Sequence, residues 1–296
     1  MINLLKVNNK NIEVLQKGSV GRVIVILTGM GCSFHEWHEI VESISETSRV
    51  IMFHRPGLGE SEIGNETRNT NAVVNELYEI LKLLSIEKPI LLVGHSYGGL
   101  CAQHFVKLYP NKVAGLLLVD STSVDLKVLD ELDTPMLNEV STDDVWMEKC
   151  KSYSTKTRNE LYKIIKPGLS QNQKQLPSEI QKHLIDFQVN PNLYKAMYLE
   201  MDSWKADALT IKEISSNLDI PLIILGRDRE YSIKVAINDG LPEDEVILLE
   251  DTWSYLIGEQ SELSKRSEVI FVKGSGHSIH LDKPDIVIGS ISKLLI

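Results

Sequence analysis

A serine between two glycines, within the run Ile-Leu-Leu-Val-Gly-His-Ser-Tyr-Gly-Gly at residues 90–99, constrains the fold of this chain more than any other feature. The residues before Ser96 read as a continuous apolar strand, and residues 97–109 have the periodicity of an amphipathic helix. A sharp strand-to-helix turn strains the serine backbone and leaves no room for β-carbons at Gly94 and Gly98. The pattern predicts that Ser96 is a nucleophile at the end of a buried strand; a chance glycine-rich turn is the alternative.

Short apolar runs alternate with longer amphipathic segments along most of the chain. Buried continuous strands separated by helices are typical of a parallel sheet with both faces covered. The sequence therefore predicts an α/β fold with a mostly parallel central sheet and helices on both faces. We expect strands at 11–17, 22–28, 49–54, 89–94, 113–119, 220–225 and 269–272, and helices at 34–47, 69–84, 97–109, 243–265 and 285–295.

The pattern changes over residues 124–218, where no strand is expected. This segment is charged and punctuated by prolines, and a break of this length between two strands is long for a loop. We therefore expect a single α/β core, residues 1–123 and 219–296, interrupted by a helical cap at 124–218. Helix candidates within the cap are 143–155, 178–188 and 192–204.

Three further groups suit the chemistry of a serine nucleophile. The run Leu-Thr-Gly-Met-Gly at residues 27–31 follows an expected strand, and its glycines would let the N–H of Met30 point at a reacting oxygen. The N–H of Tyr97 is the second expected oxyanion donor, because a helix N-terminus has unpaired N–H groups and a positive dipole end. His277, on a glycine-rich loop after the last strand, is the expected general base. Taken singly, these features also fit an ordinary turn and a surface histidine.

Together these segments resemble the α/β-hydrolase superfamily over essentially the whole chain. Residues 54–61, His-Arg-Pro-Gly-Leu-Gly-Glu-Ser, resemble the family's D-x-P-G-x-G-x-S turn. Residues 276–284, Gly-His-Ser-Ile-His-Leu-Asp-Lys-Pro, resemble its G-H-x-x-H-L-E-x-P segment. The resemblance implies an α/β-hydrolase fold with an inserted cap and a catalytic serine, acid and histidine. It also implies that the substrate is a small-molecule acyl compound and that no cofactor is needed.

The chain departs from the family pattern beside the expected active site. Thr28 stands where the family has a histidine next to the oxyanion glycine, and His54 stands where the turn has an aspartate. Those residues normally brace the loops around the oxyanion site.

The position of the catalytic acid is the third departure. The family usually places it after the strand that follows the cap, often as G-x-x-D, whereas residues 226–230 here read Gly-Arg-Asp-Arg-Glu. Asp228 is the expected acid because it stands closest to that position. Glu230, two residues further on, and Asp120, which ends the strand 113–119, are the alternatives.

The resemblance implies cleavage of an ester, thioester, lactone or amide through an acyl-enzyme at Ser96, with carboxylic-ester hydrolysis the expected type. A serine at this position argues against the relatives that use an aspartate, the haloalkane dehalogenases and epoxide hydrolases. Two alternatives remain. One is a lyase of the same fold, and the other is a signalling or ligand-binding protein with little turnover, since a fold does not identify a substrate.

The composition argues against several other classes. A formal net charge of −10 is unfavourable for a nucleic-acid surface. The three cysteines are far apart and no H-E-x-x-H pattern occurs, so neither a disulfide framework nor a metal site is expected. The apolar runs are too short to span a membrane and the N-terminus lacks a secretory pattern, so a cytoplasmic location is expected. The sequence does not predict the oligomeric state.

Overall fold

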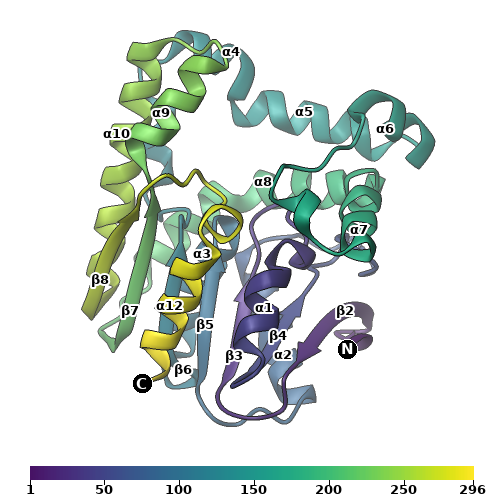
Figure 1. Ribbon diagram of the computed structural model, residues 1–296, viewed down its shortest axis with the longest axis vertical. Helices are drawn as coiled ribbons and strands as arrows, with labels where there is room; N and C mark the ends of the chain where they lie inside the picture. Colours follow the sequence, from purple (N-terminus) through teal and green to yellow (C-terminus); the bar gives the residue numbers. More distant parts are fainter.

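A computed structural model describes residues 1–296, with side chains described everywhere except at residues 140 and 141. Its described residues form an eight-stranded sheet in the order β1-β2-β4-β3-β5-β6-β7-β8 (Figure 1). The pairs β1–β2 and β2–β4 are antiparallel, and the remaining neighbours are parallel. The strands are β1 (Ile2–Val7), β2 (Lys10–Lys17), β3 (Val23–Leu27), β4 (Arg49–Phe53), β5 (Ile90–His95), β6 (Val113–Val119), β7 (Leu218–Arg227) and β8 (Ser264–Val272).

Helices connect these strands, and none in the described part is long and apolar enough to cross a membrane. Around the sheet they are η1 (Phe34–Trp37), α1 (His38–Ile44), α2 (Thr70–Leu83), α3 (Tyr97–Leu108), η2 (Pro110–Lys112), α9 (Arg229–Asn238), α10 (Glu243–Glu259), η5 (Gln260–Leu263), α11 (Ile279–Asp282) and α12 (Pro284–Leu295). Between β6 and β7 they are η3 (Leu126–Glu131), α4 (Pro135–Ser141), α5 (Asp143–Ser154), α6 (Arg158–Ile165), η4 (Gln173–Gln175), α7 (Ser178–Gln188) and α8 (Pro191–Glu213).

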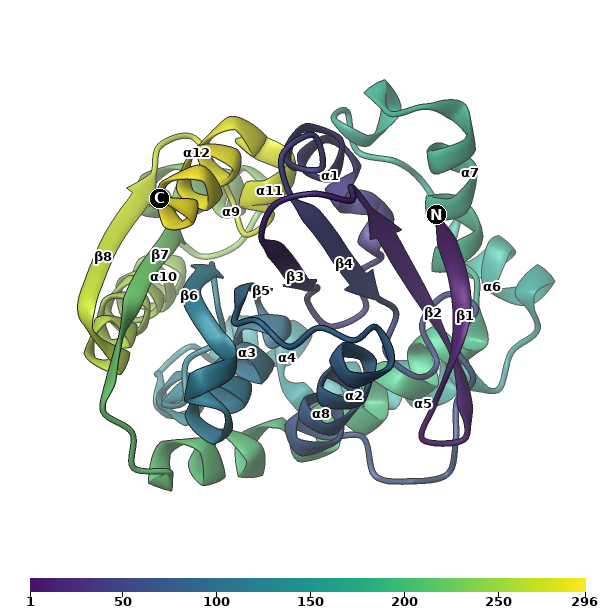
Figure 2. The ribbon, with the colours of Figure 1, turned by 90° about the horizontal axis from the view of Figure 1, so that it is seen from below.

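The sheet separates two apolar layers, because alternate residues of a strand point to opposite faces. In β3, Ile24 and Ile26 belong to a buried layer that includes residues of η1, α1 and α12. Val25 and Leu27 belong to the other layer, which includes residues of α2 and α3. Figure 2 shows α1, α11 and α12 on one side of the sheet and α2, α3 and α8 on the other. The predicted fold class, a mostly parallel sheet with helices on both faces, is confirmed.

The structure differs from the sequence prediction at local elements. Strand β1 was not expected; it forms a hairpin with β2 through Asn8 and Asn9, whose φ angles of 48° and 67° suit asparagine. Strand β7 continues to Arg227, two residues past its expected end, and helix α9 follows almost at once. The helix expected at 243–265 ends at Glu259, because β8 begins at Ser264.

The described residues between β6 and β7 form helices that lie together above the sheet in Figure 1. They are joined to the sheet side by a small apolar cluster, in which Leu58 packs with Phe187 of α7 and with Leu193 and Ala196 of α8. The division of the chain at residues 124 and 218 into core and cap stays a prediction. The long helix α8 nevertheless places one face of this segment against α2 and α3.

The strand that carries the serine should be central to stability. Leu92 of β5 is fully buried, so Leu92→Ala should lower the free energy of unfolding by about 2 to 5 kcal/mol. The control Leu83→Ala removes a side chain that is 52% exposed at the end of α2, and its effect should stay within about 1 kcal/mol. Urea denaturation of both variants checks the difference, and equal losses would contradict the assigned core.

Candidate active site

The turn between β5 and α3 holds Ser96 in a strained conformation. Its φ of 52° and ψ of −124° lie outside the regions that L-residues favour, and its side chain is partly exposed. A β-carbon at Gly94 would lie 2.6 Å from the carbonyl oxygen of Gly98, and one at Gly98 would lie 2.3 Å from that of Leu27. Glycine at these two positions is therefore required by space, as the sequence predicted.

Backbone hydrogen bonds fix this turn to the neighbouring strand. The N–H of Ser96 donates to the carbonyl oxygen of Val119 at 3.2 Å, and the N–H of Thr122 donates to the carbonyl oxygen of Ser96 at 3.1 Å. Because β5 and β6 run parallel with His95 opposite Val119, the residue after each strand reaches the same edge of the sheet. Ser96 and Asp120 thus stand side by side.

His277 lies on the loop between β8 and α11, and its ring contacts Asp120. The Nδ1 atom of His277 is 2.6 Å from Oδ2 of Asp120, whose side chain is fully buried. The backbone carbonyl oxygen of His277 is 3.1 Å from Nε2 of His95, the residue before the serine. This geometry leaves Nε2 of His277 as the ring nitrogen for a proton from Ser96. Among the described side chains, no hydrogen bond joins Ser96 Oγ to that nitrogen; such contacts are often long without substrate.

Asp120 is held ionised by four donors. Its Oδ1 accepts from the backbone N–H of Arg227 and from Nε1 of Trp253, both at 3.0 Å. Its Oδ2 accepts from His277 and, at 3.3 Å, from Nη1 of Arg227. Burial raises the pKa of Asp120, but the hydrogen bond from His277 and the charge of Arg227 outweigh it and lower that pKa to about 2. The carboxylate can therefore fix the His277 tautomer and stabilise an imidazolium.

A second carboxylate keeps Arg227 in place. Glu250 of α10 accepts from Nε and Nη2 of Arg227 at 2.9 and 2.6 Å, in the two-point geometry that suits a guanidinium. The guanidinium lies over the ring of Trp253 at 4.4 Å, and that ring meets His277 edge-on at 5.8 Å. No pattern in the sequence indicated that Arg227, Glu250 or Trp253 is part of the site.

The structure does not bring Asp228, the expected acid, to His277. Asp228 caps α9 by accepting from the N–H of Glu230 at 3.2 Å, and it accepts from the N–H of Gly274 at 2.9 Å. Because β7 runs on to Arg227 and α9 begins at residue 229, this carboxylate serves as a helix cap. Its link to Gly274 supports the base of the loop that carries His277.

Glu230 does not reach His277 either. Its carboxylate pairs with Arg229, which also pairs with Asp251 on α10. The sequence alternative that the structure brings to His277 is Asp120. The sequence signal for Asp120 was its position directly after β6, the strand next to β5.

The expected oxyanion loop lies beside the serine. A β-carbon at Gly29 would come within 3.1 Å of the β-carbon of Ser96, and Gly31 has a φ of +65°. Tyr97 begins helix α3 and is fully buried. The N–H groups of Met30 and Tyr97 therefore come from the two segments that flank Ser96, and they remain the proposed oxyanion donors.

The two residues that depart from the family pattern on this side both have hydrogen-bond partners, Thr28 within its own loop and His54 in β2 and η1. The hydroxyl of Thr28 donates to the carbonyl oxygen of Cys32 at 3.1 Å. Nδ1 of His54 donates to Glu13 at 2.7 Å, and its Nε2 accepts from the N–H of Phe34 at 3.1 Å. His54 thus braces the loop after β3 as an aspartate at this position is expected to do.

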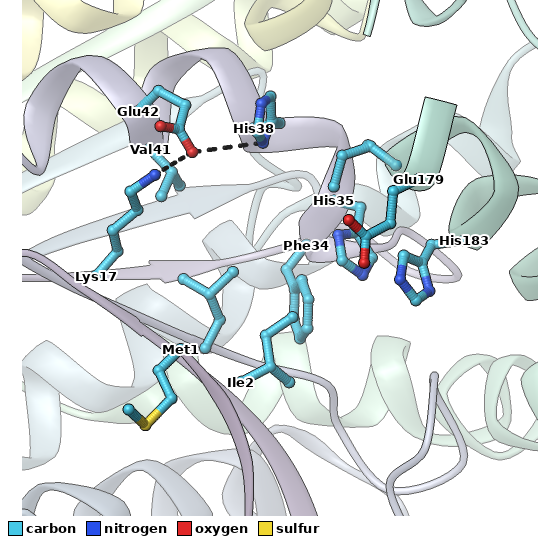
Figure 3. Close-up of a pocket in the computed structure, with 12 residues that line it drawn as sticks. Met1, Ile2, Lys17, Phe34, His35, His38, Val41, Glu42, Glu179 and His183 are labelled. Carbon is cyan, nitrogen blue, oxygen red and sulfur yellow. Dashed lines mark ion pairs between the residues drawn. The ribbon is translucent and has the colours of Figure 1, made fainter. Parts of the chain in front are cut away.

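A pocket of about 320 Å³ lies away from these residues, between the first two strands, η1, α1 and α7. Figure 3 shows His35 of η1 and His183 of α7 facing each other at its rim, and their rings stack at 4.6 Å. Its lining includes none of Ser96, His277 and Asp120. The described residues contain no cluster of three or more His, Cys, Asp or Glu that could hold a metal.

Comparisons with known proteins agree with the fold described above. A family model described as "alpha/beta hydrolase fold" matches residues 22–163. The uncharacterised protein YqjL of Bacillus subtilis (strain 168) is 30% identical over 105 residues, which cover 36% of this chain and 42% of that protein. An AB hydrolase superfamily protein of Gibberella zeae is 21% identical over 286 residues, 92% of this chain and 86% of that protein. The alignment with YqjL thus spans less than half of that relative.

Solved structures match over nearly the full length. The epoxide hydrolase CorEH superposes with a TM-score of 0.67 at 17% identity, covering 99% of this chain and 98% of that one. The enol-lactonase of Burkholderia xenovorans LB400 gives 0.68 at 13% identity, with 99% of each chain covered. A thermophilic esterase of Thermogutta terrifontis gives 0.64 at 19%, covering 100% and 98%. The chain therefore has the α/β-hydrolase fold, and the resemblance predicted from its motifs is confirmed.

Replacing Asp120 and Asp228 separately by asparagine should distinguish their roles. We expect Asp120→Asn to lower kcat for an activated ester by about 10³- to 10⁴-fold, because the amide no longer holds the His277 tautomer. Asp228→Asn serves as the matched control and should change kcat by less than about tenfold while lowering the thermal unfolding temperature. Steady-state kinetics with both folded variants checks this. A larger loss of kcat in Asp228→Asn would restore that residue as the acid.

The buried histidines predict how stability depends on pH. Burial, followed by the charges of neighbouring histidines, lowers the pKa of His35 and of His280 to about 3, and burial followed by the Lys107 charge lowers that of His104 to about 4. Between pH 6.5 and 4 the unfolded chain binds protons at these rings that the folded chain does not, so stability falls as pH falls. Burial raises the pKa of Glu36 to about 7, so in this range the folded chain binds a proton there that the unfolded chain binds only weakly. This acts in the opposite direction and cancels about the contribution of one histidine to the pH dependence.

The net effect should be a loss of at least about 1 kcal/mol of unfolding free energy per pH unit between pH 6 and 5. Urea titrations at several pH values measure this slope. His280→Asn should reduce it, because the variant removes one of the buried rings. A slope that is the same in wild type and in this variant would contradict the assignment.

Proposed function

With the α/β-hydrolase fold as the premise, we propose that this chain is a serine hydrolase. It cleaves an ester, thioester, lactone or amide of a small molecule through an acyl-enzyme at Ser96. The observation that carries the proposal is the contact of 2.6 Å between His277 Nδ1 and Asp120 Oδ2. It lies at the edge of the sheet where Ser96 has a strained backbone. Carboxylic-ester hydrolysis is the proposed type.

The mechanism begins with proton transfer from the Ser96 hydroxyl to Nε2 of His277. Oγ of Ser96 attacks the acyl carbonyl carbon, and the N–H groups of Met30 and Tyr97 stabilise the negative charge that develops on its oxygen. Asp120 stabilises the imidazolium, which then protonates the leaving group and leaves an acyl-serine. A water molecule deprotonated by His277 attacks that ester, and the carboxylic acid leaves as Ser96 recovers its proton.

The residues that lie over the oxyanion loop favour a small apolar acyl group. A β-carbon at Gly31 would lie 2.7 Å from the sulfur of Met197, so this methionine of α8 packs directly on the loop. An acyl group held at the oxyanion loop would therefore meet the apolar side chain of Met197, which offers polar acyl groups no strong hydrogen-bond partner.

A fluorophosphonate probe tests the nucleophile. The probe should label the wild-type protein at Ser96, and Ser96→Ala should abolish labelling and lower ester hydrolysis by at least about 10³-fold. Ser292→Ala, which changes an exposed serine of α12, is the matched control and should be labelled like wild type. Labelling that survives Ser96→Ala would refute the assignment.

A substrate panel then separates the proposed reaction from its alternatives. Activated esters, thioesters, lactones and aminoacyl amides should include at least one substrate that is turned over many times. Labelling at Ser96 with a single slow turnover would instead indicate a ligand-binding protein. Elimination products without water incorporation would indicate a lyase.

A further inference from the structure

A buried ion pair connects the expected oxyanion loop to a helix above it. Arg55 follows β4 and Glu200 lies on α8, and each side chain is only 1% exposed. Nε of Arg55 donates to Oε1 of Glu200 at 2.6 Å, and Nη2 donates to Oε2 at 3.1 Å. This two-point geometry fixes the plane of the guanidinium as well as its position.

The other side of the same guanidinium holds the loop before Met30. Nη1 of Arg55 donates to the carbonyl oxygen of Thr28 at 2.7 Å, and Nη2 donates to that of Gly29 at 2.9 Å. The carbonyl of Gly29 and the N–H of Met30 belong to one peptide unit, and none of the described peptide bonds is cis. In a trans peptide these two groups point in opposite directions. A donor on the Gly29 oxygen therefore sets the direction of the Met30 N–H.

Arg55 also contacts the residue that supplies the second oxyanion donor. Its guanidinium carbon lies 5.2 Å from the centre of the Tyr97 ring, within the range of a cation–π contact. One buried cation thus touches both segments of the expected oxyanion hole. Glycine at position 29 restricts this peptide little, so the direction of the Met30 N–H depends on what holds the Gly29 carbonyl. Besides Arg55, the backbone N–H of Cys32 donates to that oxygen at a longer 3.3 Å.

We propose that Arg55 is a positioning residue of the oxyanion hole and that Glu200 makes its orientation depend on the docked position of α8. When α8 packs on the loop, Glu200 orients the guanidinium and the guanidinium aims the Met30 N–H at the reacting oxygen. When α8 moves away, Arg55 loses the carboxylate that orients it, and the Gly29 carbonyl keeps only the longer hydrogen bond from the N–H of Cys32. This inference rests on the proposed serine hydrolase function.

A second buried ion pair supplies the control. Arg68 and Glu76 are 1% and 4% exposed and form a similar two-point contact at 2.5 and 3.0 Å. Glu76 lies on α2, and neither partner has a hydrogen bond to residues 28–30 among the described contacts. The charges of Glu200 and Tyr97 act on Arg68, so this pair shares the electrostatic surroundings of the Arg55 pair and lacks only its direct hydrogen bonds to the loop. Loss of this pair should therefore affect stability as loss of the Arg55 pair does, without removing a hydrogen bond from the oxyanion loop.

The test compares Arg55→Lys, Glu200→Gln and Glu76→Gln by kinetics with 4-nitrophenyl acetate and by inhibition with phenylboronic acid. The boronic acid forms a tetrahedral adduct with an active serine and so reports on the oxyanion hole. We expect Arg55→Lys to lower kcat by about 10²-fold and to weaken boronic-acid inhibition in parallel, with KM changed by less than about threefold. Glu200→Gln should lower kcat by about tenfold, whereas Glu76→Gln should keep kcat within about twofold despite a lower unfolding temperature.

Either of two results would overturn the inference. One is a change in KM alone for Arg55→Lys. The other is an equal loss of kcat in Glu200→Gln and Glu76→Gln. If Arg55→Lys does not fold, the comparison of the two glutamate variants decides. A wild-type protein that neither reacts with fluorophosphonate nor turns over any ester refutes the proposed function itself, a result distinct from a wild-type enzyme that is indifferent to these substitutions.

Discussion

The backbone of Ser96 is the constraint on which the rest of the site depends. A residue with φ of 52° and ψ of −124° has a strained backbone. Such a conformation persists only when contacts with the surrounding structure stabilise it by more than the strain costs. Here the fixing comes from β6 through the carbonyl of Val119, from the close approach of Gly98 to Leu27, and from the buried strand β5 behind the serine. The parallel sheet is thus the support that lets a strained serine project from its edge.

Two networks of charge extend from this point, one to each side of the serine. On the acid side, Asp120 lies between His277 and Arg227, and Glu250 balances the arginine. On the oxyanion side, Arg55 holds loop carbonyls and Glu200 balances it. In both networks a buried carboxylate forms an ion pair with a buried guanidinium, because an unpaired charge in either place would be costly to bury. The same arrangement therefore satisfies burial and orients groups for chemistry.

These two networks differ in what they tie together. Glu250 lies on α10 and Arg227 ends β7, so the acid side is built from elements packed directly on the sheet. Glu200 lies on α8, within the helical segment between β6 and β7. In the proposed mechanism the base and its acid would stay fixed while the oxyanion side follows the position of α8. Binding of an acyl group under Met197 would then favour the arrangement in which the oxyanion donors are aimed.

The sequence by itself determined the features that depend on neighbouring residues. The apolar run before Ser96, the flanking glycines and the following amphipathic helix specify the elbow locally, and the alternation of strands and helices specifies a parallel α/β sheet. Only the tertiary structure decided which carboxylate meets His277. Asp120 and His277 are separated by 157 positions in the chain, and their contact depends on strand order and on how far β7 extends. Asp228 looked nearer the family position, but an aspartate that begins a helix is drawn to its free N–H groups, and that helix was not evident from periodicity. The ion pair of Arg55 and Glu200 could not be predicted from the sequence for the same reason. The two residues are 145 positions apart, and a contact over that separation leaves no local sequence pattern.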